Sequence, residues 1–445
     1  MSCDENSVRI YDACGSKKAH DLRDFLHRTR TPYCWIELCT DNEAKELAGV
    51  DGLEDRRLPV CVLPSGVRLE NPTVQKLSER LGWLPAPTHR EYDVCIYGAG
   101  PAGLSAALYA ASEGLKTLIV ERYAVGGQAG QSSRIENYLG FPEGISGVEL
   151  AERAREQACK FGAELLILRE GIPSPYIPGK TACYIDDGLR ITSIVARSAI
   201  YATGVTYRRL ALRGENHFYG AGLYYNAGAS EAALTEGEHV FVLGGGNSAG
   251  QATLHLSRFA AKVTLVTRDK SLTDFMSEYL ICRLENTPNV EIITDSEVVA
   301  LLGDDILRTI TLRNNTTGKT WDEKTIWLFV SFGGVPNSQW AAELGIIRDK
   351  SGYILTGPDL VDAMSCRDCW PLNREPYFLE TSIPGVFAAG DVRSGSIKRV
   401  ASAVGEGAMA VTFVHRYLAL GGEGDTCPVP FNKSLVPKQV AGIGV

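Results

Sequence analysis

The chain has 445 residues, 44% of them hydrophobic and 22% charged, so it is long enough for about three globular domains of ordinary composition. Its formal net charge of −8, with no cluster of Lys and Arg, argues against binding to nucleic acid. The first six residues carry neither a basic flank nor an apolar run, and no stretch reaches about 18 apolar residues, which argues against a signal peptide and a membrane span.

The twelve cysteines are scattered along the chain. Cys61, Cys95 and Cys282 lie in apolar runs, where a reduced thiol behaves as a small hydrophobic side chain. We therefore expect a reducing, cytoplasmic setting with mostly structural thiols.

The first 85 residues are expected to form a domain of their own. Strands are predicted at Val8–Tyr11 and Pro32–Leu38, a helix at Lys18–Leu26, and a hairpin at Leu58–Leu69. A last helix, capped by Asn71, is predicted to end at Gly82. A proline-containing linker, Trp83–His89, then separates this domain from the rest of the chain.

The order βαβαββα, with Pro59 opening the third strand, resembles a thioredoxin or glutaredoxin fold. In that family the proline is cis and lies beside a redox dithiol. The four positions of that dithiol fall here on Ser16–Ala19, and Cys14 is two residues too early. A Cys-X-X-Cys pair at a helix N-terminus is what lowers a thiol pKa for exchange. We therefore expect a degenerate thioredoxin-like domain that serves as structure or as a docking surface.

A dinucleotide-binding fingerprint begins after this linker. The predicted buried strand Asp93–Tyr97 leads into Gly98-Ala-Gly-Pro-Ala-Gly103 and a helix, and the next strand ends in Glu121. In such a motif the glycines allow a tight turn, close approach of the backbone to a pyrophosphate, and close packing of helix on strand, while the acid binds the ribose. The helix N-terminus faces the phosphates. The expected ligands are Gly98, Gly100, Pro101, Ala102, Gly103 and Glu121.

The fingerprint recurs after the strand His239–Leu243, with an alanine in place of the third glycine. The following strand runs directly into Arg268, Asp269 and Lys270. Cations at this place accept the 2′-phosphate of NADPH, whereas an acid at the strand tip favours NADH. We therefore expect this site to bind NADPH, with Arg268 at the 2′-phosphate. The alternative is that Arg268 is only a solvated surface charge with no role in binding. The expected ligands are Gly244, Gly246, Asn247, Ser248, Ala249, Arg268 and Lys270.

Five further motifs follow in order: Gly126-Gly-Gln128, Ile135–Pro142, Ala202-Thr-Gly204, Ser331–Asn337 and Thr381–Asp391. Together with the two fingerprints they make residues 91 to about 420 similar to low-molecular-weight thioredoxin reductases. The resemblance implies an α/β architecture of two Rossmann-like domains, an NADPH domain inserted in an FAD domain, and a homodimer. It gives domains at 1–85, 90–210, 211–372 and 373–420, with a C-terminal tail at 421–445.

The resemblance also implies roles for further residues around FAD. Gln128 and Asn137 would contact the isoalloxazine, Asp391 would hold the ribitol, and Arg399 and Val400 would lie at the edge where charge develops on the reduced ring. The remaining implied cofactor ligands are Arg122, Thr203 and Gly390.

The sequence departs from the family at the redox dithiol of the inserted domain. Its two cysteine positions fall on Asn226 and Ala229, and Glu231 is the nearest residue that could replace the family's proton donor. The one Cys-X-X-Cys pair is Cys366–Cys369, in the return crossover. It is interpreted as incidental loop thiols, a relocated redox dithiol, or half of a metal site, although no second pair completes a zinc site and no metal is expected.

The sequence thus predicts an oxidoreductase that takes hydride from NADPH at FAD and passes electrons to an unidentified small protein or small molecule. Three alternatives stay open: a disulfide reductase that uses Cys366 and Cys369, a ferredoxin or quinone reductase in which the tail covers the flavin, and a non-catalytic nucleotide or redox sensor. Catalysis would involve rotation of the inserted domain about hinges near Thr203–Leu210 and 372–381.

Overall fold

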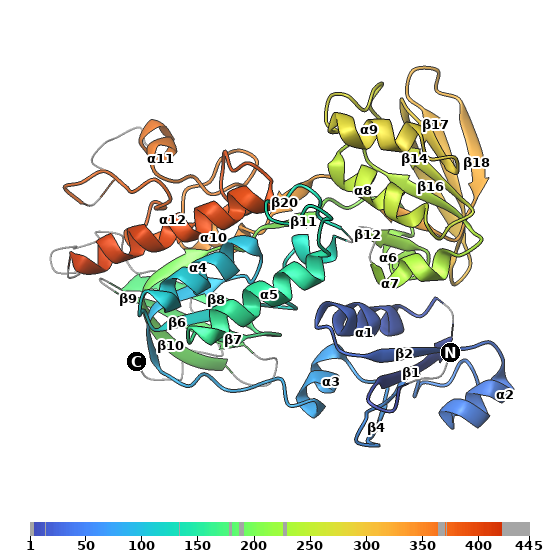
Figure 1. Ribbon diagram of the computed structural model, residues 1–445, viewed down its shortest axis with the longest axis horizontal. Helices are drawn as coiled ribbons and strands as arrows, with labels where there is room; N and C mark the ends of the chain where they lie inside the picture. Colours follow the sequence, from blue (N-terminus) through green and yellow to red (C-terminus); the bar gives the residue numbers. More distant parts are fainter. Residues whose placement is uncertain are drawn as a thin grey trace.

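A computed structural model describes residues 4–13, 15–132, 134–177, 180–186, 191–225, 229–363, 370 and 372–420. The chain forms three α/β units (Figure 1). They are an N-terminal unit up to residue 82, a first dinucleotide unit made of residues 91–204 and 337–420, and an inserted unit of residues 208–333. No helix in the described residues is long and apolar enough to cross a membrane. The same residues contain no group of three or more side chains that could hold a metal ion.

The N-terminal unit has a four-stranded sheet in the order β2-β1-β3-β4. Strand β1 pairs in parallel with β2 and antiparallel with β3, which pairs antiparallel with β4. Ser16 begins the helix α1 by accepting a hydrogen bond from the Ala19 amide. The elements are β1 (Val8–Ala13), α1 (Lys17–Arg28), β2 (Tyr33–Leu38), α2 (Asp41–Glu43), η1 (Ala44–Ala48), β3 (Val60–Val62), β4 (Arg68–Glu70) and α3 (Val74–Arg80).

The structure corrects one detail of this unit and supplies another. The N-cap of α3 is Thr73, whose hydroxyl accepts from the Lys76 amide, and not Asn71, which has a left-handed φ of 45°. The amide of Asn71 instead donates to the carbonyl oxygens of Arg57 and Pro59, so it belongs to the preceding turn. The Leu58–Pro59 peptide bond is cis.

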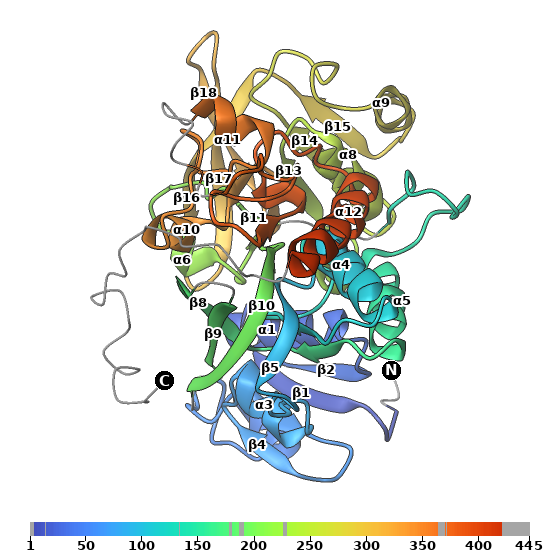
Figure 2. The ribbon, with the colours of Figure 1, turned by 90° about the vertical axis from the view of Figure 1, so that its left-hand side faces the viewer.

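The first dinucleotide unit is built on a sheet in the order β7-β6-β5-β10-β9-β8, with β21 paired in parallel to β10. Helices α4, α5 and α12 cover one face, and α12 lies directly against α4 (Figure 2). The elements are β5 (Glu91–Tyr97), α4 (Pro101–Ser112), β6 (Thr117–Val120), η2 (Ala129–Gln131), α5 (Gly147–Lys160), β7 (Glu164–Leu166), β8 (Glu170–Ile177), β9 (Lys180–Asp186), β10 (Ile191–Tyr201), α10 (Gln339–Glu343), α11 (Pro358–Ala363), β21 (Val386–Ala388), η5 (Gly390–Val392) and α12 (Val400–Ala419).

The inserted unit has a parallel sheet in the order β12-β19-β13-β14-β15 and a three-stranded antiparallel sheet, β16-β17-β18. Its buried apolar strands β13, β14 and β19 form the centre of the core, as expected for a sheet covered on both faces. The elements are α6 (Glu215–Phe218), β12 (Leu223–Tyr225), α7 (Ala229–Ala232), η3 (Ala233–Thr235), β13 (His239–Leu243), α8 (Asn247–Leu256), β14 (Lys262–Val266), α9 (Glu278–Glu285), β15 (Val290–Ile293), β16 (Ser296–Gly303), β17 (Leu307–Asn314), β18 (Thr320–Lys324) and β19 (Leu328–Val330).

Two short antiparallel strands join the inserted unit to the first dinucleotide unit. They are β11 (Val205–Tyr207) and β20 (Gly334–Pro336). After β20 the chain packs at once into the first unit, where the Trp340 ring lies 4.0 Å from that of Tyr201 and Ile346 is buried in the same core. The structure therefore places the return to the first unit at β20 and not at the predicted boundary of 372. The hinge at 372–381 stays a prediction.

The thiols differ in part from the expectation. Cys61 and Cys95 are buried, but Cys282 is exposed on α9, because it lies on the solvent side of that amphipathic helix. Cys34 of β2 is disulfide-bonded, so the cysteines in this structure are not all reduced. Cys366 and Cys369 lie outside the described residues, as do Asn226 and the tail 421–445.

Candidate functional site

The first glycine turn leads from β5 into the N-terminus of α4. Gly98 has a left-handed φ of 101° and packs on the carbonyl of Ala202. A methyl group added to Gly103 would fall on the carbonyl oxygen of Gly98, so this position permits no side chain. Gly100 is the N-cap and Pro101 the first helical residue, which leaves the first backbone N–H groups of α4 free of intrahelical partners. A turn of this shape is suited to a pyrophosphate.

Glu121 lies beside this turn at the end of β6. Its carboxylate accepts hydrogen bonds from the amides of Ala99 (2.8 Å) and Tyr123 (2.9 Å), and only 9% of its surface is exposed. Each oxygen retains a second lone pair, so a ribose hydroxyl could still donate to it. Arg122, the next residue, is exposed.

Gln128 and Thr203 lie where the first unit meets the connecting strands. The Gln128 side-chain amide donates to the Val205 carbonyl of β11 (3.0 Å), and the Thr203 hydroxyl donates to the Asn337 carbonyl (2.8 Å). Both residues therefore fix the connection between the units as well as lining the predicted flavin region. Asn137 is exposed in the loop that follows Ile135.

The return segment brings Gly390 and Asp391 next to the first turn. A Cβ on Gly390, whose φ is 75°, would lie 2.9 Å from the Ala102 methyl. Burial raises the pKa of Asp391, and Glu406 acts in the same direction while Lys398 opposes it. Arg399 is the N-cap of α12 and Val400 its first residue, so free backbone N–H groups also face this region.

A buried ion pair supports this return segment. The Arg393 guanidinium donates to both oxygens of Glu406, at 2.7 and 3.3 Å, and both side chains are at most 10% exposed. Glu406 also accepts from the Gly390 amide (2.7 Å) and the Ser396 hydroxyl (3.0 Å). The sequence gives no signal for these contacts of Glu406, because its three partners, Gly390, Arg393 and Ser396, all lie before its own helix.

The second glycine turn repeats the first geometry in the inserted unit. Gly244 has a positive φ of 145°. A Cβ added to Gly244 would lie 2.6 Å from the carbonyl oxygen of Ser331, so the two backbones pack closely here. Gly246 is the N-cap of α8, and the Asn247 side chain accepts from the Ser277 amide (2.7 Å). Ser248 is exposed on the first turn, and Ala249 is fully buried at the position of the third glycine.

The residues that follow β14 have mixed charge. Arg268 and Lys270 are exposed, whereas Asp269 turns back to the glycine turn. A Cβ on Gly245 would lie 2.7 Å from the Thr267 hydroxyl and 2.9 Å from an Asp269 carboxylate oxygen. Asp269 is thus closer to the glycine turn than its place in the sequence indicated. Its negative charge there disfavours a 2′-phosphate, whereas the charges of Arg268 and Lys270 favour one.

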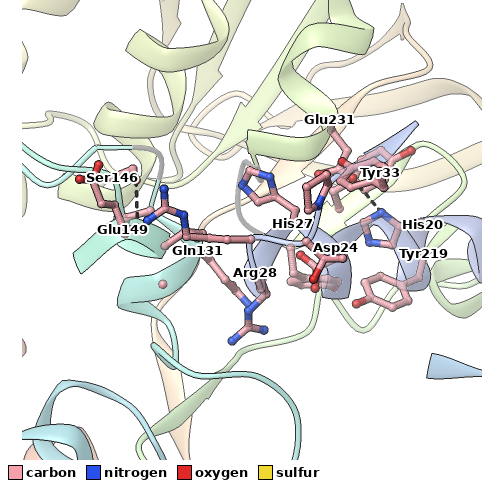
Figure 3. Close-up of a pocket in the computed structure, with 18 residues that line it drawn as sticks. His20, Asp24, His27, Arg28, Tyr33, Gln131, Ser146, Glu149, Tyr219 and Glu231 are labelled. Atoms are coloured by element: carbon pink, nitrogen blue, oxygen red, sulfur yellow. Dashed lines mark hydrogen bonds and ion pairs between the residues drawn. The ribbon is translucent and has the colours of Figure 1, made fainter. Parts of the chain in front are cut away.

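Glu231 of α7 meets a side chain from the N-terminal unit. His20 Nδ1 and Glu231 Oε1 are 2.9 Å apart, with side-chain exposures of 11% and 3% (Figure 3). The two residues line a cavity of about 470 Å³ at the junction of all three units. Its wall includes Arg28, Gln131 and Tyr225. A pair separated by 211 positions leaves no signal in the sequence.

We expect the pKa of His20 to depend on Glu231. Burial by itself lowers the pKa of His20, but attraction to Glu231 and their hydrogen bond together raise it above its ordinary value. A folded-state pKa above the unfolded value of about 6.5 means that the contact is at full strength below that pH and weakens as the pH rises through the folded-state pKa. The other titratable or charged groups around the ring are Asp21, Arg23 and Asp24 of α1 and Tyr219 and Tyr224 of the inserted unit.

Hydrogen–deuterium exchange at histidine C2, followed by mass spectrometry, measures this pKa directly. In Glu231→Gln the pKa of His20 should fall below its ordinary value, because burial then acts without the carboxylate. C2 exchange at the exposed His217, whose ring contacts the Asp304 carbonyl, is recorded in both proteins to calibrate the measurement. A His20 pKa that is the same in the two proteins would show that the ion pair does not form in solution.

Comparisons with known proteins cover the two dinucleotide units. A sequence model of the pyridine nucleotide-disulphide oxidoreductase family matches residues 92–407. Thioredoxin reductase of Bacillus subtilis is 34% identical over 328 residues, which are 74% of this chain and 95% of that protein. The crystal structure of Lactococcus lactis thioredoxin reductase in its FR conformation superposes with a TM-score of 0.65 and 30% identity, covering 74% of this chain and 99% of that one. The crystal structure of T. acidophilum thioredoxin reductase gives a TM-score of 0.65 at 28% identity, over 75% of this chain and 99% of that one.

Proposed function

The chain belongs to the pyridine nucleotide-disulphide oxidoreductase family and is thioredoxin reductase-like, and we propose that it is an NADPH-dependent FAD oxidoreductase. The observation that carries this proposal is the pair of strand–glycine turn–helix sites, one in each dinucleotide unit, joined by only two short strands. Two sites of this kind fit two different dinucleotides, and because the connection is short, the other contacts between the units set their relative orientation.

The residues of the first unit fit FAD. Gly98 and Gly103 have no room for a Cβ, so the turn between them stays tight and would cradle the pyrophosphate, with Glu121 at the ribose and Asp391 at the ribitol. Arg399 and the Val400 amide at the start of α12 would face the isoalloxazine ring together with Gln128 and Asn137. When bound, FAD supplies the two-electron chemistry that links NADPH to an acceptor.

The protein's own residues prepare this site before the cofactor binds. Glu406 holds Arg393 and the Gly390 amide, and so fixes the return segment that carries Asp391. The free N–H groups at the start of α4 and α12 present fixed positive dipoles where negative charge is to be bound.

The acceptor is not the dithiol of a typical relative. At the two positions where the relatives' pattern predicts cysteines, Ala229 opens α7, and Asn226 lies outside the described residues. Glu231, the candidate proton donor, is engaged by His20. We infer that electrons leave through an acceptor that reaches the flavin itself or through thiols elsewhere, with Cys366 and Cys369 as the candidates in this chain.

The proposed function is tested by anaerobic reduction of the purified, flavin-loaded protein. NADPH should bleach the visible flavin absorbance, and a disulfide dye added afterwards should restore it if the chain passes electrons to disulfides. Bleaching by neither NADPH nor NADH would overturn the proposal. If both Cys366→Ser and Cys369→Ser are still bleached by NADPH but no longer reduce the dye, these thiols carry electrons from the flavin to the disulfide. Unchanged dye reduction in the two variants would exclude them.

We expect Arg268→Ala to raise the KM for NADPH about tenfold or more, since a charge-assisted contact is worth on the order of 1–3 kcal/mol. The KM for NADH should stay near its original value, because NADH has no 2′-phosphate. Asp269→Asn should act in the opposite direction and lower the KM for NADPH, because the Asp269 carboxylate lies beside the glycine turn and repels a phosphate there. Steady-state kinetics with both nucleotides decide the matter: an unchanged KM for NADPH in Arg268→Ala would place the 2′-phosphate elsewhere.

A further inference from the structure

Helix α1 of the N-terminal unit touches both dinucleotide units. Its contacts with the first unit run from Asp21 to Arg28. The Phe25 ring lies edge-on to Tyr123 at 5.4 Å, and the Tyr123 hydroxyl donates to the Asp21 carbonyl (3.1 Å). Arg28 donates to the carbonyl oxygens of Ala124 (3.2 Å) and Gly127 (3.3 Å), the latter within the glycine loop next to Gln128.

The contacts of α1 with the inserted unit come from its first turns. His20 pairs with Glu231 and packs edge-on against the rings of Tyr219 and Tyr224, at 6.2 and 5.3 Å. The Lys17 ammonium lies 5.2 Å from the centre of the Tyr219 ring. This surface is tightly fitted, because a Cβ on Gly220 would lie 3.3 Å from the Lys17 backbone.

The residue before α1 extends the same contact. A Cβ on Gly15 would fall on the Ile306 side chain of the inserted unit, so Gly15 permits an approach that a larger residue would prevent. Gly15–His20 also spans the four positions where a thioredoxin-like domain would carry its dithiol. The docked surface of the N-terminal unit is therefore the surface that such a domain would otherwise present to a redox partner.

The direct connections between the two dinucleotide units are weaker than the contacts that each unit makes with α1. The strands β11 and β20 are three residues long each. The ion pair of Arg283 on α9 with Glu136, at 2.7 Å, is partly exposed, with side-chain exposures of 49% and 24%. Exposed ion pairs contribute little to stability. Removing one member of a buried pair is costly, because it leaves the other charge buried without a partner. Among the described contacts, those of α1 are the ones that bury a charged pair between units.

We propose that the N-terminal unit is a built-in docking partner that occupies the face of the inserted unit around Tyr219, Tyr224 and Glu231 and holds that unit in a fixed orientation against the first unit. Helix α1 acts as a brace, with one end on the flavin loop and the other on α7. A protein acceptor that approached this face would have to displace α1. The consequence for acceptors rests on the proposed function, but the docking itself does not.

The test compares amide hydrogen exchange in flavin-loaded variants without nucleotide. In His20→Glu two carboxylates meet in a buried site, and we expect exchange in the segment Tyr219–Tyr225 to rise about tenfold or more, which corresponds to about 1.4 kcal/mol. In the double variant His20→Glu/Glu231→Arg the pair is restored with reversed charge, and exchange should return toward that of the original protein. The matched control is Lys76→Glu on α3, whose partner Glu79 forms an exposed pair outside the interface.

Unchanged exchange in His20→Glu would overturn the proposal, as would equal exchange in the single and double variants. Flavin absorbance and far-ultraviolet circular dichroism confirm that each variant is folded, and Glu231→Gln, which keeps the shape of the side chain, replaces His20→Glu if the latter does not fold. For Glu231→Gln the expected rise in exchange is smaller, and no rise again overturns the proposal. Because the measurement needs no electron transfer, failure of NADPH to bleach the flavin would refute the proposed function and leave this result unaffected.

Discussion

Gly103→Ala is expected to abolish retention of FAD. The added methyl group would fall on the Gly98 carbonyl oxygen, and Gly98 cannot move away because it packs on the Ala202 carbonyl. Overpacking of this kind costs about 1–3 kcal/mol or more, and here it opens the turn that would hold the pyrophosphate. The ratio of visible to ultraviolet absorbance of the purified protein measures the bound flavin.

Gly405→Ala is the matched control, because it makes the same chemical change in helix α12 at a position with open space. It should keep the flavin and stabilise the helix by up to about 1 kcal/mol. If Gly103→Ala purifies with as much flavin as Gly405→Ala, the first glycine turn is not the pyrophosphate site.

Glu406→Ala is expected to destabilise the first dinucleotide unit by about 3–5 kcal/mol, the usual cost of breaking a buried ion pair. The change leaves the buried Arg393 guanidinium without its carboxylate and removes the acceptor of the Gly390 amide. Since Gly390 precedes Asp391, the affinity for FAD should fall as well. The denaturant midpoint for release of flavin fluorescence measures both effects together.

The control for this variant is Glu79→Ala, which breaks the exposed pair with Lys76 and should change the free energy of unfolding by less than about 0.5 kcal/mol, with little shift of the midpoint. Glu406→Gln separates charge from shape, because an amide can still accept from Gly390 but cannot neutralise Arg393. A midpoint for Glu406→Ala equal to that of Glu79→Ala would mean that the pair does not stabilise this unit.

Local features of the sequence predicted the two glycine turns and the strands and helices around them. A glycine that must adopt a left-handed φ, such as Gly98, or that must admit a carbonyl, such as Gly103, is required by geometry within a few residues. The same holds for the buried strands β5 and β13, whose apolar runs need no distant partner to be recognised. The family model that matches residues 92–407 is in accord with this part of the prediction.

Features that depend on several local choices were predicted less well. Asn71 and Thr73 are both good capping residues, and only the turn that binds the Asn71 amide to Arg57 and Pro59 decides in favour of Thr73. The predicted boundary of the inserted unit is at residue 372, although the motif Ser331–Asn337 lies well before it. In the structure the chain returns to the first unit at Gly334–Pro336, which pairs with the distant strand Val205–Tyr207.

The sequence by itself thus determined that this chain carries two dinucleotide-type turns, and that Asn226 and Ala229 stand where the resemblance to thioredoxin reductases places a dithiol, because each of these is a property of a few adjacent residues. Only the tertiary structure decided where the charged side chains find their partners: Glu406 on Arg393, Asp269 beside Gly245, and Glu231 on His20. Burial makes such partners necessary, since an unpaired charge inside a protein is costly, but the partner can come from any part of the chain that the fold brings near.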